Sequence, residues 1–327
     1  MENEIMNRAA LWHISSESSQ LKKIIASKKE SFLEVKSSYS LISTGTEYLV
    51  ASGQVPPTLF QSMKIPNMRG GFEFPLTYGY SLVGIVENDG AFNGKKVHLL
   101  HPHQNYCQVS SEEIFLIPEN VPEKRATLAS NLETALTATW DANVQIGDQV
   151  LIVGFGMIGA LIGRLLSFMP SVEVTVLETN AYRQSFAKKM GFSVFTELPK
   201  KNIFDLSFHT SGTNDGLQSA INGLGMEGKM IELSWYGIKK STISLGSDFH
   251  QKRQQIISSQ VGHIPANKSA RWDYTRRKEV VFKLLANPIF DEHITHEILF
   301  VESPIFFHQL RNRQLEEGLG WCSNYKN

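Results

Sequence analysis

One stretch constrains the fold more than any other: Val150 to Leu166, "VLIVGFGMIGALIGRLL", in which an apolar strand-like run meets a helix-like run through spaced glycines. In such a turn Gly154 permits the tight bend, Gly156 lets a pyrophosphate approach the backbone, and Gly159 lets helix and strand pack closely. The N-terminus of the helix then offers free N–H groups and a partial positive charge to the phosphates. The pattern predicts a dinucleotide site whose contacts include Gly154, Gly156, Met157, Ile158 and Gly159.

An acidic residue follows the turn at the distance that such a site requires. Glu178 stands nineteen residues after Gly159 and ends the strand-like run "VEVTVLE". A carboxylate there accepts hydrogen bonds from both ribose hydroxyls and repels a 2′-phosphate, which favours NAD(H) over NADP(H) as the cofactor. Arg183, at the start of the next helix-like run, is a further expected cofactor contact. The alternative is a glycine-rich turn in an unrelated α/β protein, with Glu178 a solvated strand end.

Strand-like and helix-like runs alternate through the middle of the chain, which predicts parallel βαβ units and a doubly wound sheet. The expected strands cover 149–153, 172–177, 192–195, 204–209, 229–234 and 255–261. The expected helices cover 157–168, 181–190 and 214–224.

Two turns in this region are expected to face the nicotinamide, because ligands bind outside the carboxyl ends of such strands. They are Ser211-Gly212 and Trp235-Tyr236. For Trp235 and Tyr236 the alternative is packing in the core or at an interface. His209, in the strand before the first turn, is interpreted as a hydrogen-bonded core histidine and not as a base.

The first 120 residues instead contain short strand-like runs separated by Gly, Asn and Asp clusters, which predicts a barrel-like all-β unit. After about His263, helix-like runs flank the strand-like "HITHEILF", and this tail is expected to return to the first domain. We therefore predict a β domain over 1–130, a dinucleotide-binding domain over 131–264 and a C-terminal segment over 265–327.

Composition excludes several classes of function. Lys plus Arg and Asp plus Glu both number 32, which argues against a nucleic-acid or an anionic membrane partner. Cys107 and Cys322 are too few for a disulfide framework or a four-cysteine zinc lobe. The start of the chain lacks the pattern of a signal peptide, and the apolar run from Leu151 to Met169 is broken by glycines and Arg164. A cytoplasmic protein is expected.

The order of these elements resembles that of the medium-chain dehydrogenase/reductase superfamily over nearly the full chain. The similarity rests on the runs "ISTGTEY", "FPLTYGYSLVGIVE", "ETALTATWDA", "VGFGMIG" and "KKMGF". Within the superfamily, "HPHQNYCQV" and "ELSWYG" are similar to a bacterial subgroup labelled zinc-type alcohol dehydrogenase-like. The resemblance implies an α/β protein with a GroES-like β-barrel catalytic domain and a doubly wound Rossmann dinucleotide-binding domain. It also implies NAD(P)-dependent oxidoreductase activity.

The resemblance further implies that the zinc ligands of the relatives are missing here. Their three ligand positions correspond to Thr44, Tyr80 and Ser130 in this chain. Hydroxyl groups are poor zinc ligands beside thiolate, imidazole and carboxylate. No catalytic or structural zinc is therefore expected.

A rival set of metal donors lies in "HLLHPHQNYC", which contains His98, His101, His103 and Cys107 at spacings that a metal can use. His101 and His103 stand two residues apart and can project to one side of an extended segment. No acidic residue or second cysteine completes the set nearby in the sequence. Satisfied or solvent-facing histidines are the alternative to a metal site.

Without zinc, hydrogen-bond donors have to stabilise or protonate the oxyanion that forms during hydride transfer. Tyr80 is the best candidate, because the resemblance implies that its phenol faces the nicotinamide. Thr46 matches the hydroxyl that relays protons in the zinc enzymes, and Ser43 and Glu47 are expected to complete or orient that relay. The alternatives are that Tyr80 fills the vacated metal cavity and that Glu47 is an ordinary buried acid.

The resulting hypothesis is a zinc-independent NAD(H)-linked oxidoreductase that acts on a small alcohol, carbonyl or enone. A homodimer is expected too, because the apolar run "QQIISSQVG" is placed at the sheet edge, where it can pair with its two-fold mate. Two alternatives stay open: a non-catalytic dinucleotide-binding sensor or interaction protein, and a zinc alcohol dehydrogenase with relocated ligands.

Overall fold

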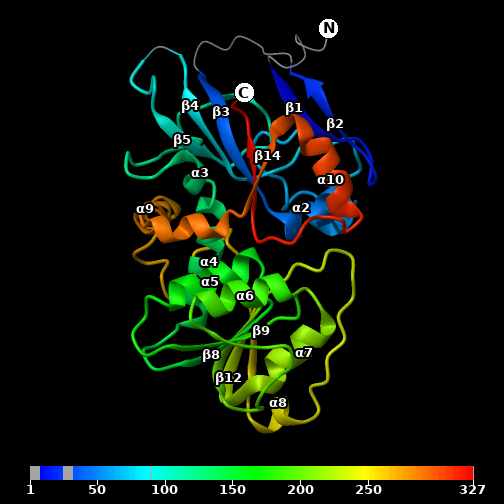
Figure 1. Cartoon of the computed structure of the whole chain (residues 1–327), viewed down its shortest axis with the longest axis vertical. Helices are drawn as coiled ribbons and strands as arrows, with labels where there is room; N and C mark the ends of the chain where they lie inside the picture. The colour runs from blue at the N-terminus through cyan, green and yellow to red at the C-terminus, as the bar shows by residue number, and fades with distance from the viewer. Residues whose placement is uncertain (1–7, 25–31, 89, 327) are drawn as a thin grey trace. The chain divides into compact units, whose positions relative to one another are not determined.

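The chain forms two compact units in the computed structural model, which describes residues 8–24, 32–88 and 90–326 (Figure 1). The first unit comprises 1–130 and 278–327, and the second comprises 131–277. Both divisions fall within helices, α4 (Ala129–Ala142) and α9 (Tyr274–Leu285). The second division lies at 277/278 and not at the expected 264/265, because residues such as Trp272 pack in the second unit, against Trp140 at a ring distance of 4.8 Å.

The first unit is built on a sheet of seven strands in the order β14-β15-β3-β4-β5-β7, with β6 paired to β3. The ten-residue β3 (Leu33–Ile42) is central, since it pairs with β4, β6 and β15. A separate antiparallel pair joins β1 (Ala9–His13) to β2 (Ser19–Lys23). The remaining strands are β4 (Leu82–Val86), β5 (Lys96–Leu99), β6 (Tyr106–Val109), β7 (Ile114–Leu116), β14 (His296–Leu299) and β15 (Trp321–Asn324).

The C-terminal tail adds a helix to the first unit. The tail helix α10 (Ser303–Arg311) buries Phe306, Phe307 and Leu310 in one cluster with Leu11 of β1 and Trp321 of β15. Burial of such apolar side chains is the main force that holds the tail on this unit. The other helices are α2 (Thr44–Ala51) and α3 (Glu123–Ala126), with short 3₁₀ turns at η1 (Pro57–Leu59), η2 (Pro288–His293) and η3 (Phe300–Glu302).

The second unit contains a six-stranded sheet in the order β10-β9-β8-β11-β12-β13, and every pair is parallel. Its strands are β8 (Gln149–Val153), β9 (Glu173–Leu177), β10 (Ser193–Phe195), β11 (Phe204–His209), β12 (Leu224–Glu232) and β13 (Gln255–Ser258). Helices α5 (Met157–Leu166), α6 (Ala181–Lys189), α7 (Asn214–Gly223) and α8 (Asp248–Gln251) lie between them in the chain. The strand order reverses direction at β8, as in a doubly wound sheet.

Two expected strands in the second unit have wrong boundaries. β12 begins at Leu224, before the expected 229, because an irregular stretch with Gly225, Gly228 and a positive φ at Glu227 (56°) interrupts the pattern without ending the strand. β13 ends at Ser258 and not at 261.

The structure addresses the expectation about membrane spans, and only part of the segment on which the expectation about a signal peptide depends. In the described ranges, no helix combines the length and apolarity that crossing a membrane requires. The expectation about a signal peptide depends on the first twenty residues, of which the first seven lie outside the described residues.

Candidate functional site

The glycine turn after β8 has backbone geometry that excludes larger residues. Gly154 has a φ of +89°, and a Cβ there would lie 2.7 Å from the backbone nitrogen of Ser211. A Cβ on Gly159 would lie 2.2 Å from the Gly154 carbonyl oxygen. Around Gly156 the nearest atom to an added Cβ is Nη1 of Arg183, at 3.8 Å, so the space beside this glycine is open. The turn therefore has the close contacts and the open approach that a pyrophosphate site needs.

The helix α5 begins at this turn with its first N–H groups uncapped by a side chain. Its N-cap is Gly156, which has no side chain, and its first residues are Met157 and Ile158. The unsatisfied N–H groups at a helix start carry partial positive charge, which favours an anion. Met157 and Ile158 begin this helix, and the guanidinium of Arg183 lies beside Gly156, so all three stay predicted phosphate contacts.

Glu178 follows β9 and is held against the same turn. Its Oε2 accepts a hydrogen bond from the Phe155 backbone N–H at 2.6 Å, and its Oε1 accepts from the N–H groups of Thr179 at 2.8 Å and Asn180 at 2.9 Å. The residue is only 7% exposed. A carboxylate can accept roughly four hydrogen bonds, so these three leave about one position for a ribose hydroxyl. The sequence had suggested that Glu178 accepts hydrogen bonds from both ribose hydroxyls.

The expected second cofactor turn contains a network that sequence reasoning missed. His209, at the end of β11, is fully buried; its Nδ1 lies 2.9 Å from both carboxylate oxygens of Glu232, and its Nε2 lies 2.7 Å from Ser211 Oγ. Tyr236 stacks on the imidazole at a ring distance of 6.4 Å, and its hydroxyl lies 3.3 Å from Glu232. In the sequence, the only indication of the His209–Glu232 pair is that Glu232 ends β12, the strand beside β11.

The other members of this turn have different surroundings. Gly212 has a φ of +66°, and its N–H donates to Ser234 Oγ at 3.0 Å. Trp235 is half-buried. Ser211 lies against the glycine turn, since its backbone nitrogen would be 2.7 Å from a Cβ added to Gly154. The structure thus brings Ser211 to the dinucleotide turn and gives Tyr236 a role in packing and hydrogen bonding around His209.

In the first unit, the four residues predicted to take part in catalysis lie together. Tyr80 precedes β4, Ser43 precedes α2, and Thr46 and Glu47 belong to α2. Burial, and next the negative charge of Glu47, raise the pKa of Tyr80 to about 12, while hydrogen bonds with Ser43 and Thr46 act in the opposite direction. The phenol is therefore protonated at neutral pH and able to donate a hydrogen bond.

Glu47 is a fully buried acid with a histidine partner. Its Oε1 accepts from the Ser43 backbone N–H at 2.8 Å, and its Oε2 lies 2.8 Å from His103 Nε2. The other ring nitrogen of His103 lies 2.7 Å from Ser40 Oγ. The sequence offered His103 as a metal donor, and the pairing with Glu47 was not predicted because the two residues are 56 positions apart.

The residues at the expected zinc positions do not fit a zinc ion. Thr44, Tyr80 and Ser130 offer hydroxyl groups only, and Ser130 Oγ donates to the Tyr80 carbonyl oxygen at 2.8 Å. Hydroxyls are poor ligands for zinc, which takes thiolate, imidazole and carboxylate.

The rival donors have other partners. His98 Nε2 lies 3.0 Å from Ser81 Oγ, and His101 Nδ1 lies 2.9 Å from the Pro102 carbonyl oxygen. Burial lowers the pKa of His98 well below its ordinary value and that of His101 to about 4. Cys107 Sγ lies 3.7 Å from His101. Among the residues that the structure describes, no three His, Cys, Asp or Glu side chains form a group that could hold a metal.

The chain was compared with protein families, curated proteins and solved structures. A scan against models of protein families found no match. D-guloside 3-dehydrogenase of Shigella flexneri is 25% identical over 225 residues, which are 64% of this chain and 64% of that protein. The chain therefore matches less than two thirds of the length of this curated relative.

Two solved structures cover nearly the whole chain. The 2R,3R-butanediol dehydrogenase from Bacillus subtilis superimposes with a TM-score of 0.76 at 17% identity, covering 98% of this chain and 100% of that one. An alcohol dehydrogenase from Escherichia coli CFT073, solved with NADH, gives a TM-score of 0.74 at 15% identity, covering 97% and 99%. These likenesses establish the fold.

The chain has the fold of the medium-chain dehydrogenases, with a GroES-like first unit and a Rossmann second unit. By sequence it is similar to dehydrogenases such as the D-guloside 3-dehydrogenase of Shigella flexneri, and by fold to alcohol dehydrogenases. The fold class and the superfamily resemblance predicted from the motifs are both confirmed.

Proposed function

We propose that the protein is an oxidoreductase that transfers hydride between NAD(H) and a small alcohol or carbonyl compound. The observation that carries this proposal is the half-buried hydroxyl cluster of Tyr80, Ser43 and Thr46 in a chain with a dehydrogenase fold. Its first unit supplies donors for an oxyanion, and its second unit supplies a dinucleotide turn. Hydride transfer to a carbonyl requires both.

In this proposal Tyr80 is the group that stabilises or protonates the substrate oxygen. Because its pKa is raised to about 12, the phenol keeps its proton at neutral pH. Its hydrogen bonds with Ser43 and Thr46 hold the hydroxyl in one place, which is what a preorganised donor requires. Glu47, one residue after Thr46, holds the Ser43 backbone and fixes the geometry of the cluster.

We propose further that this chemistry is independent of zinc. The support is the donor set at Thr44, Tyr80 and Ser130, which consists of hydroxyls. NAD(H) is proposed over NADP(H), and the support is the buried carboxylate of Glu178 beside the glycine turn, which would repel a 2′-phosphate.

The substrate class proposed first is a polyhydroxylated one. The similarity to a D-guloside 3-dehydrogenase and the three clustered hydroxyls of Ser43, Thr46 and Tyr80 both point to a sugar or sugar alcohol. Simple aldehydes, ketones and enones form the second group to be tried.

Metal analysis, nucleotide titration and a substrate screen on the same purified protein test this function. The expected result is NADH binding, less than stoichiometric zinc, and NAD(H)-dependent turnover of at least one sugar alcohol or carbonyl that chelators leave unchanged. Stoichiometric zinc that turnover requires would overturn the zinc independence. Tight NADH binding without turnover of any compound would instead favour a dinucleotide-binding sensor.

A further inference from the structure

Four hydrogen-bonding side chains form a continuous path through the first unit. Glu47 Oε2 lies 2.8 Å from His103 Nε2, and His103 Nδ1 lies 2.7 Å from Ser40 Oγ. Ser40 Oγ lies in turn 2.8 Å from the hydroxyl of Tyr325, near the C-terminus. The imidazole is packed under the turn before β4, since a Cβ on Gly79 would lie 2.8 Å from its Cδ2 and Nε2 atoms. Each group can accept a proton and, once protonated, donate one.

The inner part of this path is shielded from solvent. The exposed fraction of the side chain is 1% for Glu47 and 2% for His103, and Ser40 is fully buried. Burial of a carboxylate and an imidazole is unfavourable unless both are well paired, and apolar side chains of similar size would fill the same space without that penalty. Packing alone therefore does not explain this connected path, and a functional role has to be considered.

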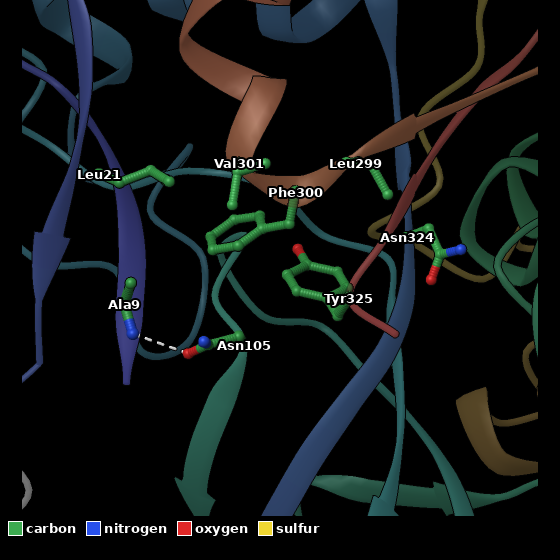
Figure 2. A pocket seen from close by; sticks show the side chains of 8 residues that line it. All are labelled: Ala9, Leu21, Asn105, Leu299, Phe300, Val301, Asn324 and Tyr325. Carbon is green, nitrogen blue, oxygen red and sulfur yellow. Dashed lines mark hydrogen bonds between the residues drawn. The ribbon is translucent and has the colours of Figure 1, made fainter. Parts of the chain in front are cut away.

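The outer end of the path opens on a small pocket (Figure 2). Tyr325 lines this pocket together with the amide side chains of Asn105 and Asn324. Its volume is about 60 Å³, enough for several water molecules beside polar partners. Leu299 and Val301 in the lining are 49% and 39% exposed. Tyr325 is therefore the member of the path that borders this pocket.

The inner end of the path adjoins the proposed donor cluster. Glu47 follows Thr46 directly in α2, and its Oε1 accepts from the backbone N–H of Ser43 at 2.8 Å. Ser43 and Thr46 both form hydrogen bonds with Tyr80. The charge of the Glu47 carboxylate also acts on the Tyr80 phenol and raises its pKa. The carboxylate therefore stands beside the hydroxyl cluster with one oxygen and contacts His103 with the other.

We propose that the Glu47–His103–Ser40–Tyr325 path is a proton relay that connects the hydroxyl cluster at Tyr80 with the water of this pocket. The proposal rests on the proposed function, because reduction of a carbonyl by hydride takes up one proton and oxidation of an alcohol releases one. His103, Ser40 and Tyr325 act through Glu47 and touch no substrate, so they are positioning and relay residues.

The proton shifts balance at each atom. In the reducing direction, a hydronium or water in the pocket gives a proton to the Tyr325 oxygen, and the original hydroxyl proton of Tyr325 moves to Ser40. The original Ser40 proton moves to His103 Nδ1, while the proton on Nε2 moves to Glu47. These two shifts leave the number of protons on His103 unchanged and exchange only its tautomer. Glu47 then restores the proton that the Tyr80 cluster gives to the substrate oxygen, and in oxidation the same shifts run in reverse.

Tyr325→Phe tests the relay during turnover, because it keeps the ring and removes only the outer hydroxyl. Reduction by NADH should slow by roughly tenfold or more, as loss of a proton-transfer group does. The solvent isotope effect in D₂O should rise, and the isotope effect from NADH deuterated at the transferred position should fall toward unity. Tyr39→Phe is the matched control, since Tyr39 is the neighbour of Ser40 on β3 and lies outside the path.

A second readout requires no substrate. Selective ¹⁵N labelling of the histidines allows exchange of the His103 ring N–H with water to be followed by NMR. Tyr325→Phe and Ser40→Ala should slow this exchange relative to the wild type and Tyr39→Phe, whereas a merely loosened structure would speed it up. Circular dichroism and thermal unfolding establish that each variant is folded.

The outcomes separate the relay from the proposed function. Unchanged turnover in Tyr325→Phe, a loss of turnover without a rise in the solvent isotope effect, or unchanged exchange at His103 overturns the relay. If the wild type reduces no compound with NADH, the proposed function fails, and the exchange measurement alone decides whether the path conducts protons.

Discussion

The carboxylate of Glu178 accepts a hydrogen bond from the backbone N–H of Phe155 at 2.6 Å. This contact joins the residue after β9 to the middle of the glycine turn after β8. The acid that would recognise the ribose is therefore also part of the scaffold of the phosphate turn. Any substitution of Glu178 disturbs both functions at once, so the choice of cofactor is better tested with two nucleotides on the unmodified protein than by mutation.

NAD(H) should bind at least about tenfold more tightly than NADP(H), a difference of about 1.4 kcal/mol. The reason is that a 2′-phosphate would approach the buried carboxylate of Glu178. Fluorescence titration with NADH and NADPH under the same conditions measures the ratio. Equal affinities, or a preference for NADPH, would show that the role given to Glu178 is wrong.

Gly156→Ala and Gly159→Ala should fail in different ways. A methyl group on Gly159 would lie 2.2 Å from the Gly154 carbonyl oxygen, so the variant should lose stability as the turn is forced open. Next to Gly156 the nearest atom is 3.8 Å away, so that variant should fold normally and lose dinucleotide affinity, because the methyl occupies the place of the pyrophosphate.

Thermal unfolding and NADH titration of both variants test the difference. Gly45→Ala is a control for glycine replacement as such, since no atom lies within 4 Å of an added Cβ there. Normal NADH affinity in folded Gly156→Ala would contradict the assignment of this turn as the phosphate site.

The sequence predicted the fold well because its strongest signals are local. The glycine spacing, the apolar strand before it and the acid after β9 all depend on residues close together in the chain, and α5 begins at Met157 as expected. The two acid–histidine pairs were missed for the opposite reason. Glu47 and His103 are 56 residues apart, and His209 and Glu232 are 23 apart, so only the folded sheet brings each pair together.

Stability should decrease as the pH falls from about 6.5 toward 4. Burial lowers the pKa values of His13 and His98 well below the ordinary value of 6.5 and that of His101 to about 4. Between pH 6.5 and these lowered pKa values, the histidines are protonated in the unfolded chain but stay neutral in the folded protein. Their contribution to the free energy of unfolding is therefore fully present above pH 6.5 and is lost as the pH falls through the folded-state pKa values. Urea unfolding at a series of pH values measures the slope.

His101→Asn should flatten this slope, because the amide can take over the hydrogen bond to the Pro102 carbonyl oxygen without titrating. His263→Gln, at an exposed position, should leave the slope unchanged. A free energy of unfolding that stays constant over this pH range would contradict the neutral state of the buried histidines.

We also propose a homodimer formed through the edge of the second unit. In the described part of the chain β13 ends the strand order, and Ile256 on it is 39% exposed. An apolar edge of this kind favours pairing with a two-fold mate. Light scattering should give the mass of two chains, Ile256→Lys should shift it toward one, and Ile146→Lys, at a position 71% exposed, should not. A wild-type monomer at micromolar concentration would exclude this arrangement.

Tyr80→Phe tests the central claim about catalysis, since it keeps the ring and removes only the hydroxyl. If Tyr80 is the donor to the substrate oxygen, NADH affinity and folding should be unchanged and turnover should fall by roughly 10²-fold or more. Tyr78→Phe is the matched control, because Tyr78 is a buried neighbour with its ring 6.2 Å from that of Tyr80 and takes no part in the proposed cluster.

The competing explanation for Tyr80 is that its ring only fills space at this position. In that case Tyr80→Phe should be nearly silent, whereas Tyr80→Ala should cost roughly 3 kcal/mol of stability through the void that it leaves. Chelators should have no effect on the unmodified protein, because the groups at Thr44, Tyr80 and Ser130 are hydroxyls. Full activity in Tyr80→Phe, or turnover that chelators abolish, would show that another group stabilises the oxyanion.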